Sequence, residues 1–161
     1  MKFLFILFFL VGCSNLEFIY DRYYENILKD STSLTLTGDQ KNIAYSQLVS
    51  LIGKNVEDVY ALEVRVKEII SKEVVDSDST TSKYNVSHTI RYSLIKTKNE
   101  CSLLEKKITT TSNYNSKSAG YNFGTDVSKT TTIKNNITNN IVDFLKTASA
   151  LQIAELCKNE D

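Results

Sequence analysis

Three successive segments with the patterns of β-strands constrain the fold of this chain more than any other feature. They span about 59–70, 84–96 and 101–114, and short polar turns join them. In the first segment Leu62, Val64 and Val66 fall on one side, and charged residues fall on the other. Such alternation predicts strands with one buried and one solvated face. Because consecutive strands with short connections pair side by side, the three segments predict an antiparallel meander.

One further strand and two helices complete the expected domain. Residues 33–37 alternate, and a helix over 40–52 follows, with Asp39 as its N-cap and Gly53 as its stop. A last helix begins near residue 125 or 126. Its apolar stripe consists of Val127, Thr130, Ile133, Ile137, Ile141, Phe144, Leu145 and Ala148. The order β-α-β-β-β-α predicts an α+β two-layer sandwich, with two helices packed on one face of a four-stranded sheet. The other sheet face is expected to be polar and solvated.

The N-terminus carries an apolar run from Phe3 to Gly12 that ends directly before Cys13. A run this short does not span a bilayer, which needs about 20 apolar residues. With Lys2 in front, the run is typical of a secretory signal. The segment Leu10-Val11-Gly12-Cys13 resembles a bacterial lipobox, which implies cleavage before Cys13 and attachment of lipid, palmitate included, to this cysteine. An ordinary signal peptide with an incidental cysteine is the alternative.

These features divide the chain into four parts. Residues 1–12 form the cleaved signal peptide, 13–30 the lipidated N-terminus and tether, 31–150 the α+β domain, and 151–161 a C-terminal tail. Residue 14 is Ser rather than Asp, which favours the outer membrane and its periplasmic side. If Cys13 is lipidated, Cys101 and Cys157 are the remaining cysteines, and the oxidising periplasm would allow them to form a disulfide. Two free, partly buried thiols are equally compatible with the sequence.

Composition and motifs argue against several functions. The formal net charge of zero disfavours nucleic acid as the main partner. The one histidine, His88, lies on the apolar side of its strand, as expected of a hydrogen-bonded core residue rather than a catalytic base or ligand. No catalytic residues, metal site or cofactor motif are identified, so we expect no enzyme. Arg65, Arg91, Lys106 and Lys107 are the candidate binding residues, for an anionic lipid headgroup. An ordinary solvated sheet face is the alternative reading of these four cations.

Short segments along the chain are similar to one family. Tyr60-Ala61-Leu62-Glu63-Val64 matches a Tyr-x-Leu-x-Val strand, Ile90–Leu94 matches x-x-Tyr-x-Leu, and Ser112-Asn113-Tyr114-Asn115 precedes Ser118 and Tyr121. With the lipobox and the closing helix, this order resembles the LptE family of lipopolysaccharide-assembly lipoproteins. The chain departs from the family in its final helix, which is usually rich in Ala. That helix instead contains Asn135, Asn136, Asn139, Asn140 and several threonines, and Asn99 replaces a usual turn glycine.

The resemblance implies a non-enzymatic role in the outer membrane. LptE proteins sit inside the large β-barrel LptD, help it assemble, and act as a plug while lipopolysaccharide is delivered to the outer leaflet; some bind lipopolysaccharide directly. Two other functions remain open at this stage. One is an auxiliary lipoprotein of a lipid-transport ABC system. The other is a periplasmic ligand-binding lipoprotein, which would need an apolar pocket between sheet and helices.

Overall fold

The computed structural model describes residues 27–73, 81–117 and 123–151 of the 161-residue chain. Its elements, in chain order, are β1 (Thr32–Gly38), α1 (Lys41–Ile52), β2 (Tyr60–Glu73), β3 (Thr81–Lys96), the short helix η2 (Thr97–Asn99), β4 (Cys101–Lys117) and α2 (Phe123–Ser149). The order β-α-β-β-β-α and the four-stranded sheet predicted from the sequence are confirmed. No helix in the described ranges is long and apolar enough to cross a membrane.

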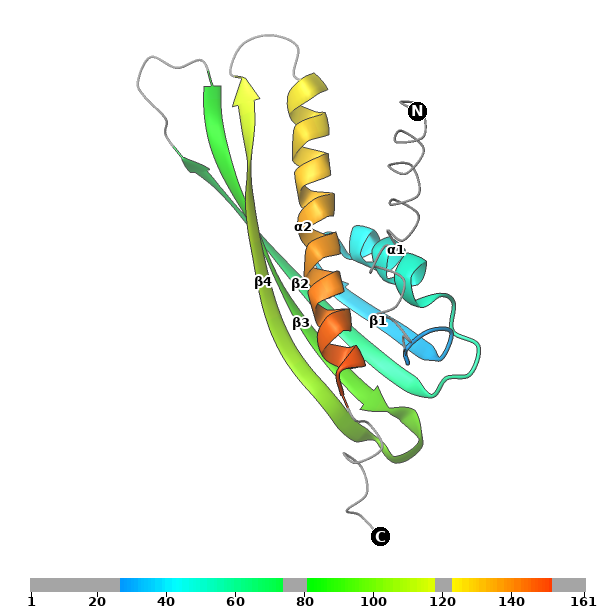
Figure 1. Cartoon of the computed structure of the whole chain (residues 1–161). Helices are drawn as coiled ribbons and strands as arrows, with labels where there is room; N and C mark the ends of the chain where they lie inside the picture. The colour runs from blue at the N-terminus through cyan, green and yellow to red at the C-terminus, as the bar shows by residue number, and fades with distance from the viewer. Residues whose placement is uncertain (1–26, 74–80, 118–122, 152–161) are drawn as a thin grey trace, which may run out of the picture.

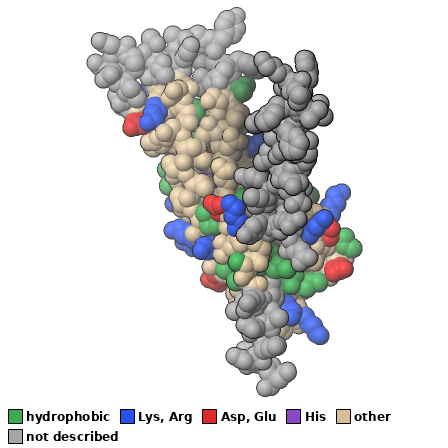
Figure 2. All heavy atoms as spheres, in the orientation of Figure 1, with side chains coloured by type: hydrophobic (Ala, Val, Ile, Leu, Met, Phe, Trp, Pro, Cys, Tyr) green, Lys and Arg blue, Asp and Glu red, His purple; other side chains and the backbone are tan. Residues whose placement is uncertain are grey.

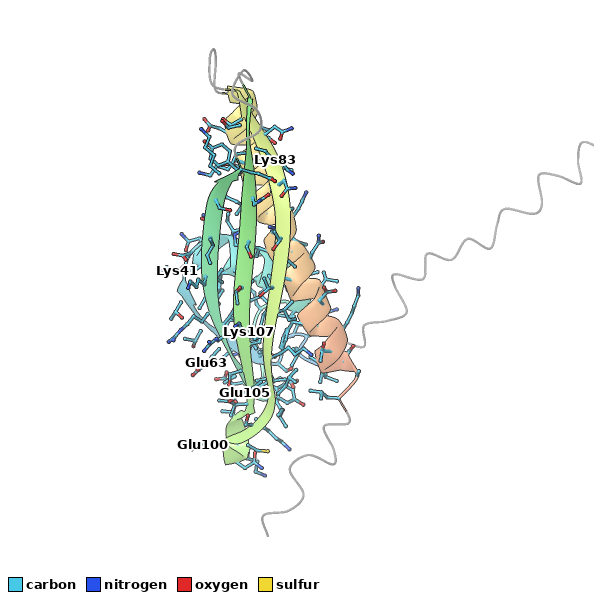
Figure 3. The ribbon with its side chains drawn as sticks, turned by 90° about the vertical axis from the view of Figure 1, so that its left-hand side faces the viewer. Lys41, Glu63, Lys83, Glu100, Glu105 and Lys107 are labelled. Carbon is cyan, nitrogen blue, oxygen red and sulfur yellow. The ribbon has the colours of Figure 1, made fainter. Side chains whose placement is uncertain are left out.

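The sheet is mixed and has the spatial order β1-β2-β3-β4. β1 pairs parallel with β2, and α1 forms the crossover between them. β2, β3 and β4 form the expected antiparallel meander. Figure 1 shows both helices on one face of the long, curved sheet, with α2 lying along the strands and α1 beside the β1 end. The opposite face is left without a covering layer of described residues (Figure 3).

The core lies between the sheet and the two helices. Its buried apolar side chains come from every layer: Leu62, Val64 and Val66 of β2, Ile90 and Leu94 of β3, Ala44, Leu48 and Ile52 of α1, and Ile137, Ile141 and Phe144 of α2. Tyr92 stacks on Phe144 with ring centroids 4.1 Å apart. Leu28 is fully buried in the same cluster. The core therefore includes a residue from the end of the segment 13–30, which we had assigned to the tether.

The apolar stripe of α2 begins later than predicted. Ile133 and the stripe residues after it are buried, but Val127 is 51 % exposed and Thr130 is exposed as well. The first turns of α2 extend past α1 (Figure 1), so no other described helix packs beside them. The 3.6-residue periodicity was correct, but it does not show how far along the helix a neighbouring element reaches.

The prediction of Asp39 as the N-cap of α1 is wrong. The capping position is Gln40, which has a left-handed backbone with φ 51° and makes no capping hydrogen bond with its side chain. Asp39 instead continues the pairing of β1 with β2: its N–H donates to the Val66 carbonyl at 3.0 Å, and its carboxylate accepts from the Glu68 N–H at 2.9 Å. The predicted stop at Gly53 is confirmed, with φ 78°.

The turn between β3 and β4 also differs in detail from the expectation. Glu100, and not Asn99, adopts the left-handed conformation, with φ 50°. Asn99 closes the short helix η2, so the reversal occurs one residue later. A register shift at Leu94 and Ile95 follows in the β3–β4 ladder. Leu103, which is unpaired in that register, is buried.

Candidate anion-binding face of the sheet

Three cations stand side by side on the sheet face that points away from the helices. The strand register places Arg65 of β2 opposite Arg91 of β3, and Arg91 opposite Lys107 of β4. Thr37 of β1 extends the same line on the other side of Arg65. Neighbouring side chains in such a line have Cβ atoms about 5 Å apart. We call Arg65, Arg91 and Lys107 the cationic row.

A second line of residues borders the cationic row. Thr35, Glu63, Ser93 and Glu105 occupy the next outward-facing positions of the four strands. Figure 3 shows Glu63 of β2 and Glu105 and Lys107 of β4 in the same half of the sheet. The two lines surround a shallow hollow of about 630 Å³ on the outer face. The three charges of the cationic row therefore line one side of the hollow and two negative charges line the other, and Lys106 also contributes to its wall.

The cationic row is not neutralised within the described part of the protein. The ion pairs found there are Lys83–Glu73 and Lys146–Asp143, and neither involves the row. Like charges placed directly opposite one another destabilise a sheet. An anion bound across the row would relieve this repulsion, and the planar fork of each arginine suits two oxygens of a phosphate or carboxylate. The arrangement is therefore suited to binding an anionic group from solution.

The structure separates the four candidate binding residues into two groups. Arg65, Arg91 and Lys107 belong to the cationic row, but Lys106 pairs with Tyr92, whose side chain is buried on the helix side. Alternation therefore directs Lys106 away from the row, although it contributes to the wall of the hollow. Lys106 is therefore not a fourth member of the cationic row, although it is adjacent to Lys107 in the sequence.

His88 is fully buried and fully hydrogen-bonded, as expected of a core histidine. Its Nε2 lies 2.9 Å from Glu68 Oε2, directly across the β2–β3 ladder. Its Nδ1 lies 3.4 Å from Asn136 Nδ2. Because the Asn136 amide donates here, Nδ1 is the acceptor and Nε2 carries the proton donated to Glu68. Gln40 Nε2 also donates to Glu68, at 3.2 Å. These contacts hold the imidazole in a structural network between the two layers.

Two asparagines of α2 form the rest of this network, and sequence reasoning missed their role. Asn136 donates to the Val86 carbonyl at 2.9 Å and accepts from the Ser112 hydroxyl at 2.6 Å. Asn140 accepts from the Tyr92 hydroxyl at 2.9 Å and donates to the Ile108 carbonyl at 3.0 Å. We had treated these asparagines only as departures from an Ala-rich helix. Their four-residue spacing, within the apolar stripe, was the available signal.

The Tyr92 hydroxyl is held in its neutral form by its surroundings. Burial raises the pKa of Tyr92 far above its ordinary value, and the nearby Asp143 carboxylate adds to the rise. A neutral phenol can donate to Asn140, which a phenolate could not. Among the described residues, every buried side-chain nitrogen or oxygen has a hydrogen-bond partner. The interior is thus a satisfied polar network rather than an open site.

The cysteines lie mostly outside the described residues. Cys101 is partly buried at the start of β4 and is disulfide-bonded. Cys157, its predicted partner, and the predicted lipidation site Cys13 fall in the ranges not described, so both assignments stay predictions. Within the described ranges, no three His, Cys, Asp or Glu residues are grouped so as to hold a metal ion.

Comparisons with known proteins find similarity in fold. No family model matches the sequence, and no curated protein matches it. A presumed lipoprotein from Caulobacter crescentus CB15 superposes with a TM-score of 0.55 at 12 % identity, over 74 % of this chain and 88 % of that one. A minor lipoprotein from Acinetobacter baumannii superposes with a TM-score of 0.50 at 15 % identity, over 75 % and 91 %. Rare lipoprotein B from Shewanella oneidensis gives 0.48 at 12 %, over 74 % and 94 %.

At these identities the likeness concerns the fold alone. The first two matches show that the two-layer arrangement of this chain also occurs in bacterial lipoproteins. The shared region covers about three quarters of this chain and most of each of the other two. The fold is therefore one that small lipoproteins also adopt, and the biochemical role of this chain has to be argued from its surface.

Proposed function

We propose that this chain is a non-enzymatic outer-membrane lipoprotein, anchored through Cys13 on the periplasmic side, that partners an LptD-like β-barrel. In this role it acts as a plug and assembly factor while lipopolysaccharide is delivered to the outer leaflet. The observation that carries the proposal is the cationic row, which forms no ion pair with any described residue and lies on a sheet face that no described element covers. The lipobox-like sequence before Cys13 and the fold found in lipoproteins support it.

The cationic row matches the chemistry of a phosphate-bearing lipid. Two arginines and one lysine on adjacent strands offer several N–H donors to one anionic group. The bordering Glu63 and Glu105 would repel an anion placed on their side of the hollow. A bound phosphate would therefore be confined to the line from Arg65 to Lys107.

The outer face also suits the interior of a β-barrel. The lumen of an outer-membrane barrel is polar, so a domain held there needs a polar surface. Beyond the charged lines, the outer face carries Thr, Ser and Asn side chains among others, and Thr89 and Thr109 hydrogen-bond across β3 and β4 at 2.9 Å. Such a face can form hydrogen bonds to a polar wall without exposing a large apolar patch.

The interior of the domain favours this proposal over a small-ligand-binding lipoprotein. A binding pocket would be expected between the sheet and the helices, where the ligand could be enclosed. In that region Tyr92 stacks on Phe144, and asparagines of α2 reach the sheet directly. The hollow of about 630 Å³ lies instead on the outer face. An auxiliary lipoprotein of a lipid-transport ABC system remains the alternative. The two functions differ in the partner protein, which is a β-barrel in the first and an ABC transporter in the second.

The partner can be identified directly. A C-terminally tagged copy is expressed in its own host, extracted in mild detergent, and purified for mass spectrometry. We expect a stoichiometric large β-barrel in the outer-membrane fraction, together with an N-terminal peptide that carries acylated Cys13. Recovery of ABC-transporter subunits in place of a barrel would contradict the proposal.

The anion-binding role is tested by two matched lysine variants. Lys107 belongs to the cationic row, whereas Lys67 lies on the same face, one line farther along, opposite Thr89. We expect Lys107→Gln to weaken lipopolysaccharide binding about tenfold, equivalent to about 1.4 kcal/mol. Lys67→Gln should change it much less. Equal losses in the two variants would show that only the overall charge matters and that the row is not a site.

A further inference from the structure

Three exposed apolar side chains lie where the described chain begins. Ile27 is 37 % exposed, Leu51 at the end of α1 is 40 % exposed, and Val56 in the loop to β2 is 78 % exposed. We call these residues the apolar rim. Val56 has the highest exposure among the large hydrophobic side chains found exposed in the described ranges. Apolar side chains gathered at one edge of a domain and left in water are unfavourable, so such a surface commonly contacts a partner or a membrane.

The backbone of the apolar rim is fixed by hydrogen bonds. The Asp30 N–H donates to the Ile52 carbonyl at 2.7 Å, and the Asp30 carbonyl accepts from the Val56 N–H at 2.7 Å. The next loop residues are closed by Asn55, whose Nδ2 donates to Asp58 Oδ1 at 2.6 Å. These bonds tie the first described residues, the end of α1 and the loop into one unit. Val56 is thus held outward by ordered backbone rather than by a loose loop.

The charges around the apolar rim do not favour a strongly charged partner. Lys29 and Lys54 lie on the same segments, and neither forms an ion pair within the described residues. Asp30, Glu57 and Asp58 oppose them in the same unit. Figure 2 shows hydrophobic side chains mixed with both signs of charge at the lower right, where Figure 1 places the loop between α1 and β2. Near-balanced charge with protruding aliphatic groups suits the boundary between headgroups and acyl chains, with the lysines extending to the headgroups.

We propose that the apolar rim contacts the lipid bilayer to which the chain is anchored. This inference rests on the lipid anchor at Cys13, which is part of the proposed function, but not on the barrel or on lipopolysaccharide. Ile27 follows Cys13 by fourteen residues, a segment whose fully extended reach is at most about 50 Å. The anchor therefore limits the distance between this end of the domain and the membrane surface to at most that length. Contact of Val56 and Leu51 with the acyl boundary would orient the domain and leave the cationic row free for its ligand.

The sequence offers a clean reporter for this contact, because the chain contains no tryptophan. Val56→Trp places a single fluorophore on the apolar rim. Val127→Trp is the matched control, since Val127 is also an exposed valine, at 51 %, near the start of α2 at the other end of the domain. Lipidated full-length variants are incorporated into phosphatidylcholine vesicles with brominated or unbrominated acyl chains. Circular dichroism checks that each variant retains its fold, and Leu51→Trp supplies a second reporter.

The expected result is a blue-shifted emission of V56W that loses most of its intensity in brominated vesicles, with V127W unchanged. L51W should show a partial loss. A V56W emission that stays red-shifted and unquenched, in protein that floats with the vesicles, would overturn the contact while leaving the anchor intact. Wild-type protein that fails to float would overturn the anchor and the contact with it. Equal quenching of V56W and V127W would also overturn a specific orientation.

Discussion

Asn140 joins α2 to the sheet, and we expect Asn140→Ala to lower the free energy of unfolding by about 3 kcal/mol. The side chain is fully buried. The substitution removes the hydrogen bond that Asn140 donates to the Ile108 carbonyl at 3.0 Å. It also removes the oxygen that accepts from the Tyr92 hydroxyl at 2.9 Å. A buried hydroxyl left without a partner costs about 1–3 kcal/mol, and each further lost bond about 1 kcal/mol. The expected loss is a large fraction of a typical domain stability of about 5–15 kcal/mol.

The neighbouring Asn139 provides a matched control because its side chain is exposed. Asn139→Ala carries the same gain in helix propensity, about 0.5 kcal/mol, without the loss of buried hydrogen bonds. Urea titration followed by far-UV circular dichroism measures both variants, and equal slopes show that the midpoints report stability. If Asn140→Ala and Asn139→Ala shift the midpoint alike, the buried network does not stabilise the helix–sheet contact, and this reasoning is refuted.

A second substitution isolates the Tyr92–Asn140 bond. In the double variant Asn140→Ala with Tyr92→Phe, the orphaned hydroxyl is gone, so we expect the combined loss to fall short of the sum by about 1–2 kcal/mol. Strict additivity would mean that the two side chains do not interact energetically, despite their 2.9 Å separation.

Two further perturbations follow from the backbone and from the buried phenol. Gly38→Ala should destabilise the fold by about 2 kcal/mol or more, because Gly38 has φ 94° and an added Cβ would collide with the Val66 carbonyl oxygen. A thermal midpoint equal to that of wild type would contradict this prediction. Because the pKa of Tyr92 is raised above its ordinary value of 10.0, the folded state holds this proton more tightly than the unfolded state. The resulting stability is present below about pH 10 and lost as pH rises further, so urea titrations should show wild type weakening relative to Tyr92→Phe above that pH. If the stabilities of wild type and Tyr92→Phe change in parallel above that pH, the buried Tyr92 hydroxyl does not cause the loss.

The candidate site shows how far pattern reasoning reaches. Alternation alone directed Arg65, Arg91 and Lys107 to the same outer face, because side chains on a strand change sides at every residue. Alternation could not show that the three cations lie side by side, because this depends on the register of the three strands. The length of the turns and the shift near Leu94 determine that register. Lys106 is a different case: it was grouped with Lys107, although alternation alone already directs adjacent strand residues to opposite faces.

The sequence by itself determined the elements, their order and the two-layer class, because hydrophobic periodicity is local and each element carries its own apolar face. Only the tertiary structure decided how those faces meet. It turned Asn136 and Asn140 from apparent helix weaknesses into buried partners of the sheet, since a polar side chain is stabilised in a core only when specific groups from distant segments reach it. It likewise brought Ile27, Leu51 and Val56 to one rim, through backbone hydrogen bonds between segments that no periodicity connects.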